Sequence, residues 1–146
     1  MDMTYGLNDQ QKEAVLTLEG PLLILAGAGS GKTKTLTHRI AYLLHETDIT
    51  SDEILAVTFT NKAAKEMRMR LAELLNRNPD SYSFMPYMGT FHGICVRLLR
   101  EDGESIGVAR NFVIYDESDK QGLIKSVAKK LGIKLDSGLK ARTVAS

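Results

Sequence analysis

Two short apolar runs, each followed by a helical pattern, organise the first half of the chain. Residues 22–26 and 54–58 show almost no polar alternation, as expected of parallel strands that are buried on both faces. After each run, apolar positions recur every three or four residues, which predicts helices from about residue 32 to 44 and from about residue 62 onward. The predicted buried positions of these two helices are Leu36, Ile40, Leu43, Leu44, Ala63, Ala64, Met67, Leu71 and Leu74. This alternation predicts a parallel α/β sheet with right-handed crossovers.

A helix is also predicted before the first apolar run. Asn8 can serve as its N-cap, and Gln11, three residues later, can form the far half of a capping-box-like pair. This helix is expected to run from about residue 9 to 18, because Gly20-Pro21 then breaks the chain. The predicted order therefore begins with a capped helix that leads into the first strand.

The second half of the chain is less regular. A short extended segment around residues 87–90 leads into a third amphipathic helix, whose apolar positions are Ile94, Cys95, Leu98 and Leu99. Beyond that helix the pattern changes to a short extended run at residues 112–115 and a helix whose cap is either Asp116 or Ser118. The tail that reaches Ser146 is polar and small, and we expect it to be weakly ordered.

Composition narrows the class of protein. A chain of 146 residues with 43% hydrophobic and 25% charged residues is long enough for one globular domain, which excludes disordered and fibrous classes. The net charge of +1 means that any nucleic-acid surface must come from local clusters of lysine and arginine. One cysteine, Cys95, excludes an internal disulfide and a cysteine-built metal site. Without a signal peptide or an apolar run of about 18 residues, a cytoplasmic protein is expected.

A glycine-rich loop, residues 26–33, connects the first predicted strand to the helix after it. Its glycines let successive main-chain amides point inward around an anion, Lys32 can reach the β- and γ-phosphates, and the Thr33 hydroxyl can ligate a phosphate-bound Mg²⁺. Ala26 replaces the usual first glycine, a mild departure because alanine fits wherever φ is negative. A glycine turn without a ligand is the alternative, but it would not need Lys32 and Thr33 directly after the last glycine. The loop therefore predicts binding of a nucleoside triphosphate.

Two further motifs lie at the carboxyl ends of predicted strands, the edge at which parallel sheets bind ligands. Residues 58–62 place an aromatic ring, two hydroxyls, an amide and a cation there, so that Phe59 can stack on a base while the polar groups hold phosphates. The alternative is that Phe59 belongs to the core and Asn61 only caps the next helix. Residues 89–93 form a similar motif at the next helix start, where main-chain amides, Thr90 and His92 are available to a phosphodiester backbone.

The histidines give no sign of catalysis or metal binding. No aspartate or serine is placed to make His92 a catalytic base, and a lone histidine is more often a surface or core group than a ligand. His38 and His45 fit a helix face and its end, without metal-ligand spacing.

Taken together and in this order, the motifs resemble the beginning of a superfamily-one DNA helicase of the UvrD/PcrA/Rep kind, over Leu7 to about Tyr115. Residues 7–11 resemble that family's adenine-recognising motif, in which the amide of a glutamine, here Gln11, offers one donor and one acceptor to adenine. Residues 58–64 and 89–97 resemble its two early single-strand-contacting motifs. The resemblance implies an ATP and Mg²⁺ site made of Gln11, Ala26, Gly27, Ala28, Gly29, Ser30, Gly31, Lys32, Thr33 and Lys34.

The same resemblance implies roles in catalysis and in DNA binding. Lys32 and Thr33 match the family's catalytic Walker A positions, and Lys34 is placed to approach the nucleotide. The implied partner is single-stranded or partly duplex DNA, with no membrane. The implied DNA-contacting residues are Phe59, Thr60, Asn61, Lys62, Thr90, Phe91 and His92.

The resemblance also sets an expected fold and its limits. It implies an incomplete RecA-like P-loop NTPase sheet with flanking helices in residues 1–110, and the start of an inserted helical subdomain in residues 111–146. The family's ATPase site needs an aspartate-glutamate pair, but Asp116-Glu117 is rejected because Ser118-Asp119-Lys120 follows it instead of glutamine and a second aspartate. The pair and the second motor domain are then expected beyond Ser146. One sheet edge would be unpaired, so we expect marginal stability or a protein association that covers the edge.

The resemblance therefore implies the amino-terminal part of an ATP-dependent 3′-to-5′ DNA helicase. Alone, it is expected to bind Mg-ATP weakly and to show little or no turnover. One alternative is a small P-loop phosphotransferase, which would need a base and an acceptor pocket that the sequence does not show. Another is a noncatalytic, truncated product that binds nucleotide or DNA.

Overall fold

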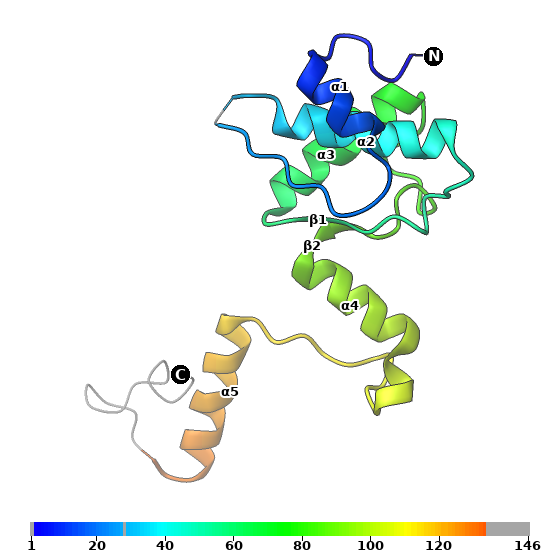
Figure 1. Cartoon of the computed structure of the whole chain (residues 1–146). Coiled ribbons are helices and arrows are strands. Elements are labelled where there is room, and N and C mark those ends of the chain that lie inside the picture. Colours follow the sequence, from blue (N-terminus) through cyan, green and yellow to red (C-terminus); the bar gives the residue numbers. More distant parts are fainter. Residues whose placement is uncertain (1, 28, 134–146) are drawn as a thin grey trace. The chain divides into compact units, whose positions relative to one another are not determined.

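The structure is a computed structural model that describes residues 2–27 and 29–133 (Figure 1). Residue contacts divide the chain into two units, Met1–Leu99 and Arg100–Ser146, and the boundary falls within a helix. The sheet and the phosphate loop belong to the first unit. A domain boundary at residue 110 stays a prediction.

A short parallel sheet with flanking helices forms the centre of the first unit. Strands β1 (Ala56–Thr58) and β2 (Met88–Thr90) pair with Ala56 opposite Met88 and Thr58 opposite Thr90. The helices are α1 (Asp9–Leu16), α2 (Lys32–Glu46), α3 (Asn61–Leu75) and α4 (Phe91–Asp102). α3 packs on both strands, α2 packs on α3, and α1 packs on α2. The predicted α/β class and parallel pairing are confirmed, as an incomplete RecA-like arrangement.

The first predicted strand is wrong. Residues 22–26 form neither strand nor helix, and Leu23 and Leu25 are 80% and 86% exposed instead of buried. Figure 1 shows the chain between α1 and α2 as an extended loop. A strand is held by hydrogen bonds to a neighbour, and in the described part of the chain β1 and β2 pair only with each other. The apolar run therefore has strand-like composition without a strand beside it.

The core lies where α2 and α3 meet the sheet. Its buried members are Met3, Ile40, Ala41, Ala56, Met67, Leu71, Ala72, Phe84, Met85 and Met88. Predicted positions Ile40, Met67 and Leu71 are confirmed, and Leu71 is completely buried. Ala63 is exposed, contrary to the prediction, because it lies in the first turn of α3 next to the open end of β1.

Arg68 on α3 holds the loop that leads into β2 by hydrogen bonds to its main chain. Its guanidinium donates to the main-chain oxygens of Phe84, of Met85 at 2.7 Å and of Met88 at 3.1 Å. Burial lowers the pKa of Arg68, but arginine still keeps its charge at neutral pH. Met85 adopts a left-handed φ of +50°. Its main-chain oxygen accepts the Arg68 hydrogen bond, which stabilises this bent segment. One side chain thus ties the loop before β2 to α3.

The second unit contains the end of α4, a short 3₁₀ helix η1 (Gly103–Ile106) and α5 (Glu117–Lys130). The Arg100 guanidinium lies 5.7 Å from the centre of the Phe112 ring, a cation–π contact that ties the segment after η1 to α4. None of the helices in residues 2–27 and 29–133 combines the length and apolarity needed to cross a membrane. The polar tail from residue 134 lies outside the described residues.

Candidate functional site

The phosphate loop closes on its own lysine. Lys32 begins α2, and its Nζ donates to the main-chain oxygens of Ala26 at 2.9 Å and Gly27 at 2.6 Å. The Ser30 hydroxyl donates to the Gly27 oxygen at 2.7 Å, a second side-chain hydrogen bond within the loop. No side chain caps the amino end of α2, so its first amides can meet an anion. Ala28 lies outside the described residues.

Gly31 lies at a position that favours glycine. Its φ is +84°, the left-handed region in which side chains are strained. A Cβ at this position would also lie 2.8 Å from Nε2 of Gln11. The backbone conformation therefore favours glycine where the loop turns into α2, and a Cβ there would also displace the end of the Gln11 side chain.

Gln11 connects the amino-terminal segment to the phosphate loop. Its main-chain amide and side-chain Oε1 form the predicted capping box with Asn8, at 2.9 and 3.1 Å, which is confirmed. Its Nε2 donates to the Ser30 oxygen at 3.2 Å. A carboxamide has two N–H donors and two acceptor lone pairs, so one of each is still left for another partner. That remaining pair is what adenine recognition requires.

Thr33 and Lys34, the two residues that follow Lys32, contact different parts of the chain. Thr33 lies in the first turn of α2 and is half-buried, and its main-chain oxygen accepts a bond from the Thr37 hydroxyl at 2.9 Å. Its role as an Mg²⁺ ligand stays a prediction. Lys34 donates to the Gly6 oxygen at 2.6 Å, so in this structure its ammonium serves the amino-terminal segment. In the described residues, no group of three or more histidines, cysteines or carboxylates is placed to hold a metal ion.

The two strand-end motifs meet at one edge of the sheet. Because Thr58 pairs with Thr90 in a parallel register, both strands end at the same level and both following helices start there. The Thr58 hydroxyl lies 3.1 Å from the Thr60 oxygen and 3.5 Å from the Gly89 oxygen, which links the two junctions directly. Motifs separated by about 30 residues in the sequence thus form one surface.

The aromatic rings at this edge face solvent. Phe59 is fully exposed, so the alternative that it belongs to the core is wrong. Phe91 is 65% exposed and meets the His92 ring edge-to-face, with centroids 6.2 Å apart. An exposed apolar ring costs solvation free energy unless a partner covers it, which suits a base-stacking role.

The threonines at this edge start helices. The hydroxyl of Thr60, rather than the side chain of Asn61, caps α3 by accepting from the Ala63 amide at 3.1 Å. Thr90 does the same for the Gly93 amide at 3.2 Å. A hydroxyl that accepts one bond still has its hydrogen to donate to a phosphate. Asn61 and Lys62 are exposed in the first turn of α3, where they are available to an anion.

Sequence reasoning missed the contacts that two residues, Arg97 and His38, make. Arg97 on α4 lies 4.9 Å from the Tyr82 ring centre and 5.2 Å from that of Tyr87, so it ties the loop before β2 to α4. His38 is buried and its Nδ1 lies 2.7 Å from the Met3 oxygen. Neither contact has a local sequence signal, because each joins residues at least ten positions apart.

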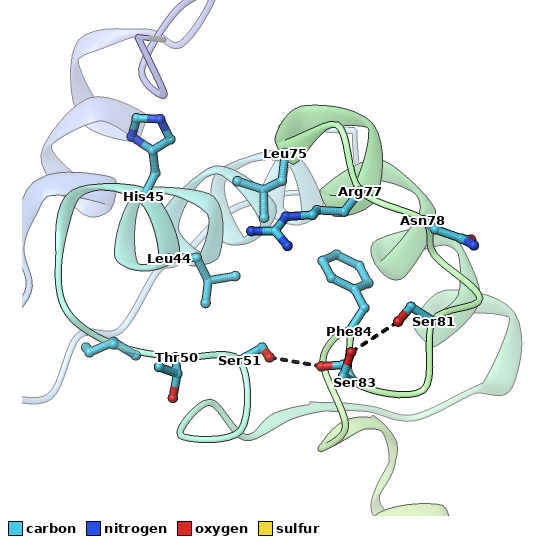
Figure 2. Close-up of a pocket in the computed structure, with 11 residues that line it drawn as sticks. Leu44, His45, Thr50, Ser51, Leu75, Arg77, Asn78, Ser81, Ser83 and Phe84 are labelled. Atoms are coloured by element: carbon cyan, nitrogen blue, oxygen red, sulfur yellow. Dashed lines mark hydrogen bonds between the residues drawn. The ribbon is translucent and has the colours of Figure 1, made fainter.

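A hollow of about 580 Å³ lies away from the phosphate loop, between the carboxyl ends of α2 and α3 and the loop before β2 (Figure 2). Leu44, Leu75 and Phe84 supply its apolar walls, and Ser51 donates to the Ser83 oxygen at 3.0 Å across one end. It contains none of the predicted site residues. This hollow is therefore separate from the candidate site.

Asp116 has a structural role in the second unit. Its carboxylate accepts from the Asp119 amide at 2.8 Å, and the Asp119 carboxylate accepts from the Asp116 amide at 3.2 Å. This capping box makes Asp116 the N-cap of α5 and confirms one of the two predicted caps. A carboxylate used in this way supports its rejection as a Walker B residue.

Two replacements of Asp116 separate these roles. Asp116→Ala is expected to lower the stability of α5 by about 1 kcal/mol, whereas Asp116→Asn keeps the cap and the helix. Neither should change Mg-ATP affinity, because the Asp116 carboxylate is already used as the cap of α5. Circular dichroism and calorimetric titration measure the two quantities. Weaker Mg-ATP binding in Asp116→Asn would restore this carboxylate to the nucleotide site.

Comparison with known proteins gives a family match and two similar proteins. Residues 7–144 match the family described as "UvrD/REP helicase N-terminal domain". The chain is 54% identical over 127 residues to a protein of Staphylococcus epidermidis called "ATP-dependent DNA helicase PcrA", covering 87% of this chain and 17% of that protein. A Staphylococcus aureus protein with the same description is 54% identical over 123 residues, covering 84% and 16%. The chain therefore spans about one sixth of the length of these relatives.

Proposed function

Because the chain belongs to the UvrD/REP helicase N-terminal domain family, we propose that it binds Mg-ATP at the phosphate loop and single-stranded DNA at the carboxyl edge of the sheet. The closed loop supports this proposal most strongly. Lys32 holds its ammonium against two loop oxygens beside the uncapped start of α2, and Gln11 contacts the same loop. A positive charge and free amides at one place match the oxygens of a triphosphate.

The proposed nucleotide site divides into three functions. Gln11 reads the base with its remaining donor and acceptor, the loop amides and Lys32 hold the phosphates, and Thr33 ligates Mg²⁺ carried by the nucleotide. When bound, Mg²⁺ would neutralise charge on the phosphate oxygens. Lys32 must leave the Ala26 and Gly27 oxygens to reach the phosphates, so we expect the loop to open on binding.

The proposed DNA surface combines rings with hydrogen-bond donors. Phe59 stacks on a base, and Thr90, His92, Asn61 and Lys62 face the phosphodiester backbone, with Thr60 and Phe91 alongside. This assignment rests on the shared edge that the Thr58–Thr90 register creates and on the exposure of the rings. Stacking on an aromatic ring tolerates any base, which suits contact with single strands of varied sequence.

The activity of a whole helicase is a wider proposal. We propose that this chain works as the amino-terminal part of an enzyme that unwinds DNA in the 3′-to-5′ direction, with residues 1–110 in the motor domain and residues 111–146 in an inserted helical subdomain. None of the residues assigned to the nucleotide site is an aspartate or a glutamate, so we expect little turnover from this chain alone. DNA and ATP as substrates favour a cytoplasmic location. A protein association is also proposed, and the exposed side chains of Leu23 and Leu25 are consistent with one at the loop that contains them.

Calorimetric titration tests the central proposal. Mg-ATP should produce measurable but weak heat, and an oligothymidylate should change the nucleotide affinity, because the two sites lie on one small unit. A change produced by a small metabolite instead would favour the phosphotransferase alternative. No heat from any purine nucleotide, on protein with the expected circular dichroism spectrum, would overturn the nucleotide site. Phosphate release at about 1 per second or faster, lost in Lys32→Ala, would overturn the expected lack of turnover.

A further inference from the structure

Three side chains of α2 each hold main-chain oxygens of the amino-terminal segment, residues 3–17. Lys34 donates from Nζ to the Gly6 oxygen at 2.6 Å. His38 Nδ1 lies 2.7 Å from the Met3 oxygen. Arg39 donates from one guanidinium nitrogen to the Ala14 oxygen at 2.5 Å and also to the Thr17 oxygen. We call Lys34, His38 and Arg39 the α2 clamp.

The three contacts are chemically specific. The Met3 oxygen can only accept, so His38 carries its hydrogen on Nδ1, and both residues are buried, with 7% and 4% of their surfaces exposed. Gly6 has a φ of +73°, a turn that presents its oxygen to the Lys34 ammonium. α1 has no basic residue in its own last turn, and Arg39 supplies the positive charge that its final carbonyls favour.

The clamp and the phosphate loop both form hydrogen bonds with the amino-terminal segment. The segment carries Gln11, whose Nε2 donates to the Ser30 oxygen of the loop. α2 begins at Lys32, where the loop ends, so the clamp residues lie on the helix that directly continues the loop. The distance between the carboxamide of Gln11 and the phosphate-binding amides is therefore set by contacts that α2 makes.

We propose that Lys34, His38 and Arg39 are positioning residues that hold Gln11 in register with the phosphate loop and so set the preference for adenine nucleotides. This inference rests on the proposed nucleotide site. The clamp touches the main chain of the segment rather than the base, and it acts through Gln11. Loosening it should weaken recognition of the base while the phosphate contacts of the loop remain.

Lys34 allows a decisive comparison, because a direct contact with phosphate is the competing role for its ammonium. Lys34→Met keeps the length of the side chain and removes the donor, Lys34→Arg keeps a donor, and Lys65→Met removes an exposed charge on α3 as the matched control. Each variant is titrated in Mg²⁺ buffer with ATP, GTP and inorganic tripolyphosphate. We expect Lys34→Met to reduce the ratio of ATP to GTP affinity roughly five- to tenfold and to leave tripolyphosphate affinity unchanged. Lys34→Arg should restore the ratio.

Two variants of His38 provide a second test. Unlike Lys34, the buried His38 side chain has no long, flexible ammonium that could reach a phosphate. His38→Leu removes the donor to the Met3 oxygen, whereas the amide nitrogen of His38→Asn can occupy the position of Nδ1. The Leu variant should lose base preference, and hydrogen exchange of the α1 amides should speed up. The Asn variant should keep both properties. If His38→Leu does not fold, the Lys34 series still decides.

Hydrogen exchange of the α1 amides in the ligand-free Lys34→Met variant separates the clamp from a direct contact with the base. Faster exchange together with a lower ratio of ATP to GTP affinity would support the clamp, and a lower ratio with unchanged exchange would overturn it. An equal loss of ATP and tripolyphosphate affinity in Lys34→Met would make Lys34 a phosphate ligand and overturn its place in the clamp. An unchanged ratio of ATP to GTP affinity in Lys34→Met would also overturn the proposal. If the unmodified chain binds none of the three ligands, the proposed nucleotide site itself fails, a result distinct from failure of the clamp alone.

Discussion

Replacing Lys32 with alanine should weaken Mg-ATP binding by roughly 10- to 150-fold, which corresponds to about 1.5–3 kcal/mol for hydrogen bonds to a charged group. The Lys32 ammonium donates to the main-chain oxygens of Ala26 and Gly27 within the loop. Its loss removes the charge that is proposed to reach the β- and γ-phosphates, while the amides at the start of α2 remain. Calorimetric titration with Mg-ATP measures the change.

The same substitution should leave folding stability almost unchanged. Ala26 is half-buried and Gly27 is exposed, so their oxygens can bond to water once the ammonium is gone. Lys65→Ala removes an equally exposed charge from α3 and should alter neither property. A large drop in melting temperature for Lys32→Ala would show that the lysine supports the fold, and an affinity equal to that of the unmodified chain would remove it from the nucleotide site.

Local signals in the sequence predict local structure well in this protein. The capping box of Asn8 and Gln11 needs only residues three positions apart, and the structure confirms it. The start of α2 after Gly31 follows from the glycine turn, and the buried stripe at Met67 and Leu71 follows from helical periodicity. Each of these features depends on neighbours within about one helical turn, which the sequence displays directly.

Features that depend on distant partners were not predictable in the same way. Residues 22–26 have the composition of a buried strand, but a strand also needs a neighbour with which to pair. Met3 and Met85 are buried because His38 and Arg68 hold the segments that contain them. Hydrophobic pattern alone gives no indication of these side-chain to main-chain bonds, since their partners lie 17 to 35 positions away.

The candidate site shows the same division. The residue types of the loop and the two strand-end motifs indicate nucleotide and nucleic-acid chemistry, and the parallel register brings the two motifs to one edge as expected. The sequence does not reveal that Gln11 already contacts Ser30 or that Lys34 holds Gly6. These contacts relate base recognition to the phosphate loop, and only the fold places their partners together.

The DNA surface gives the second large expected effect. Phe59→Ala should weaken binding of an oligothymidylate by about 1–3 kcal/mol, or roughly 5- to 150-fold, because one base loses its stacking platform. Phe59 is fully exposed, so its removal leaves no cavity and should not lower the melting temperature. Fluorescence anisotropy with a labelled oligonucleotide at fixed salt measures the affinity, since phosphate contacts vary strongly with ionic strength.

Two further variants distinguish stacking from simple apolar contact at this position. Phe59→Leu keeps an apolar side chain without a π-face, and Phe59→Tyr keeps the ring. If Phe59 stacks on a base, the Tyr variant should bind like the unmodified chain and the Leu variant should bind nearly as weakly as the Ala variant. Equal binding by the Leu variant and the unmodified chain would reduce Phe59 to a general apolar contact. Unchanged binding by the Ala variant would remove it from the DNA surface, and the polar groups of the shared edge at Thr58 and Thr90 would then have to account for affinity without a ring.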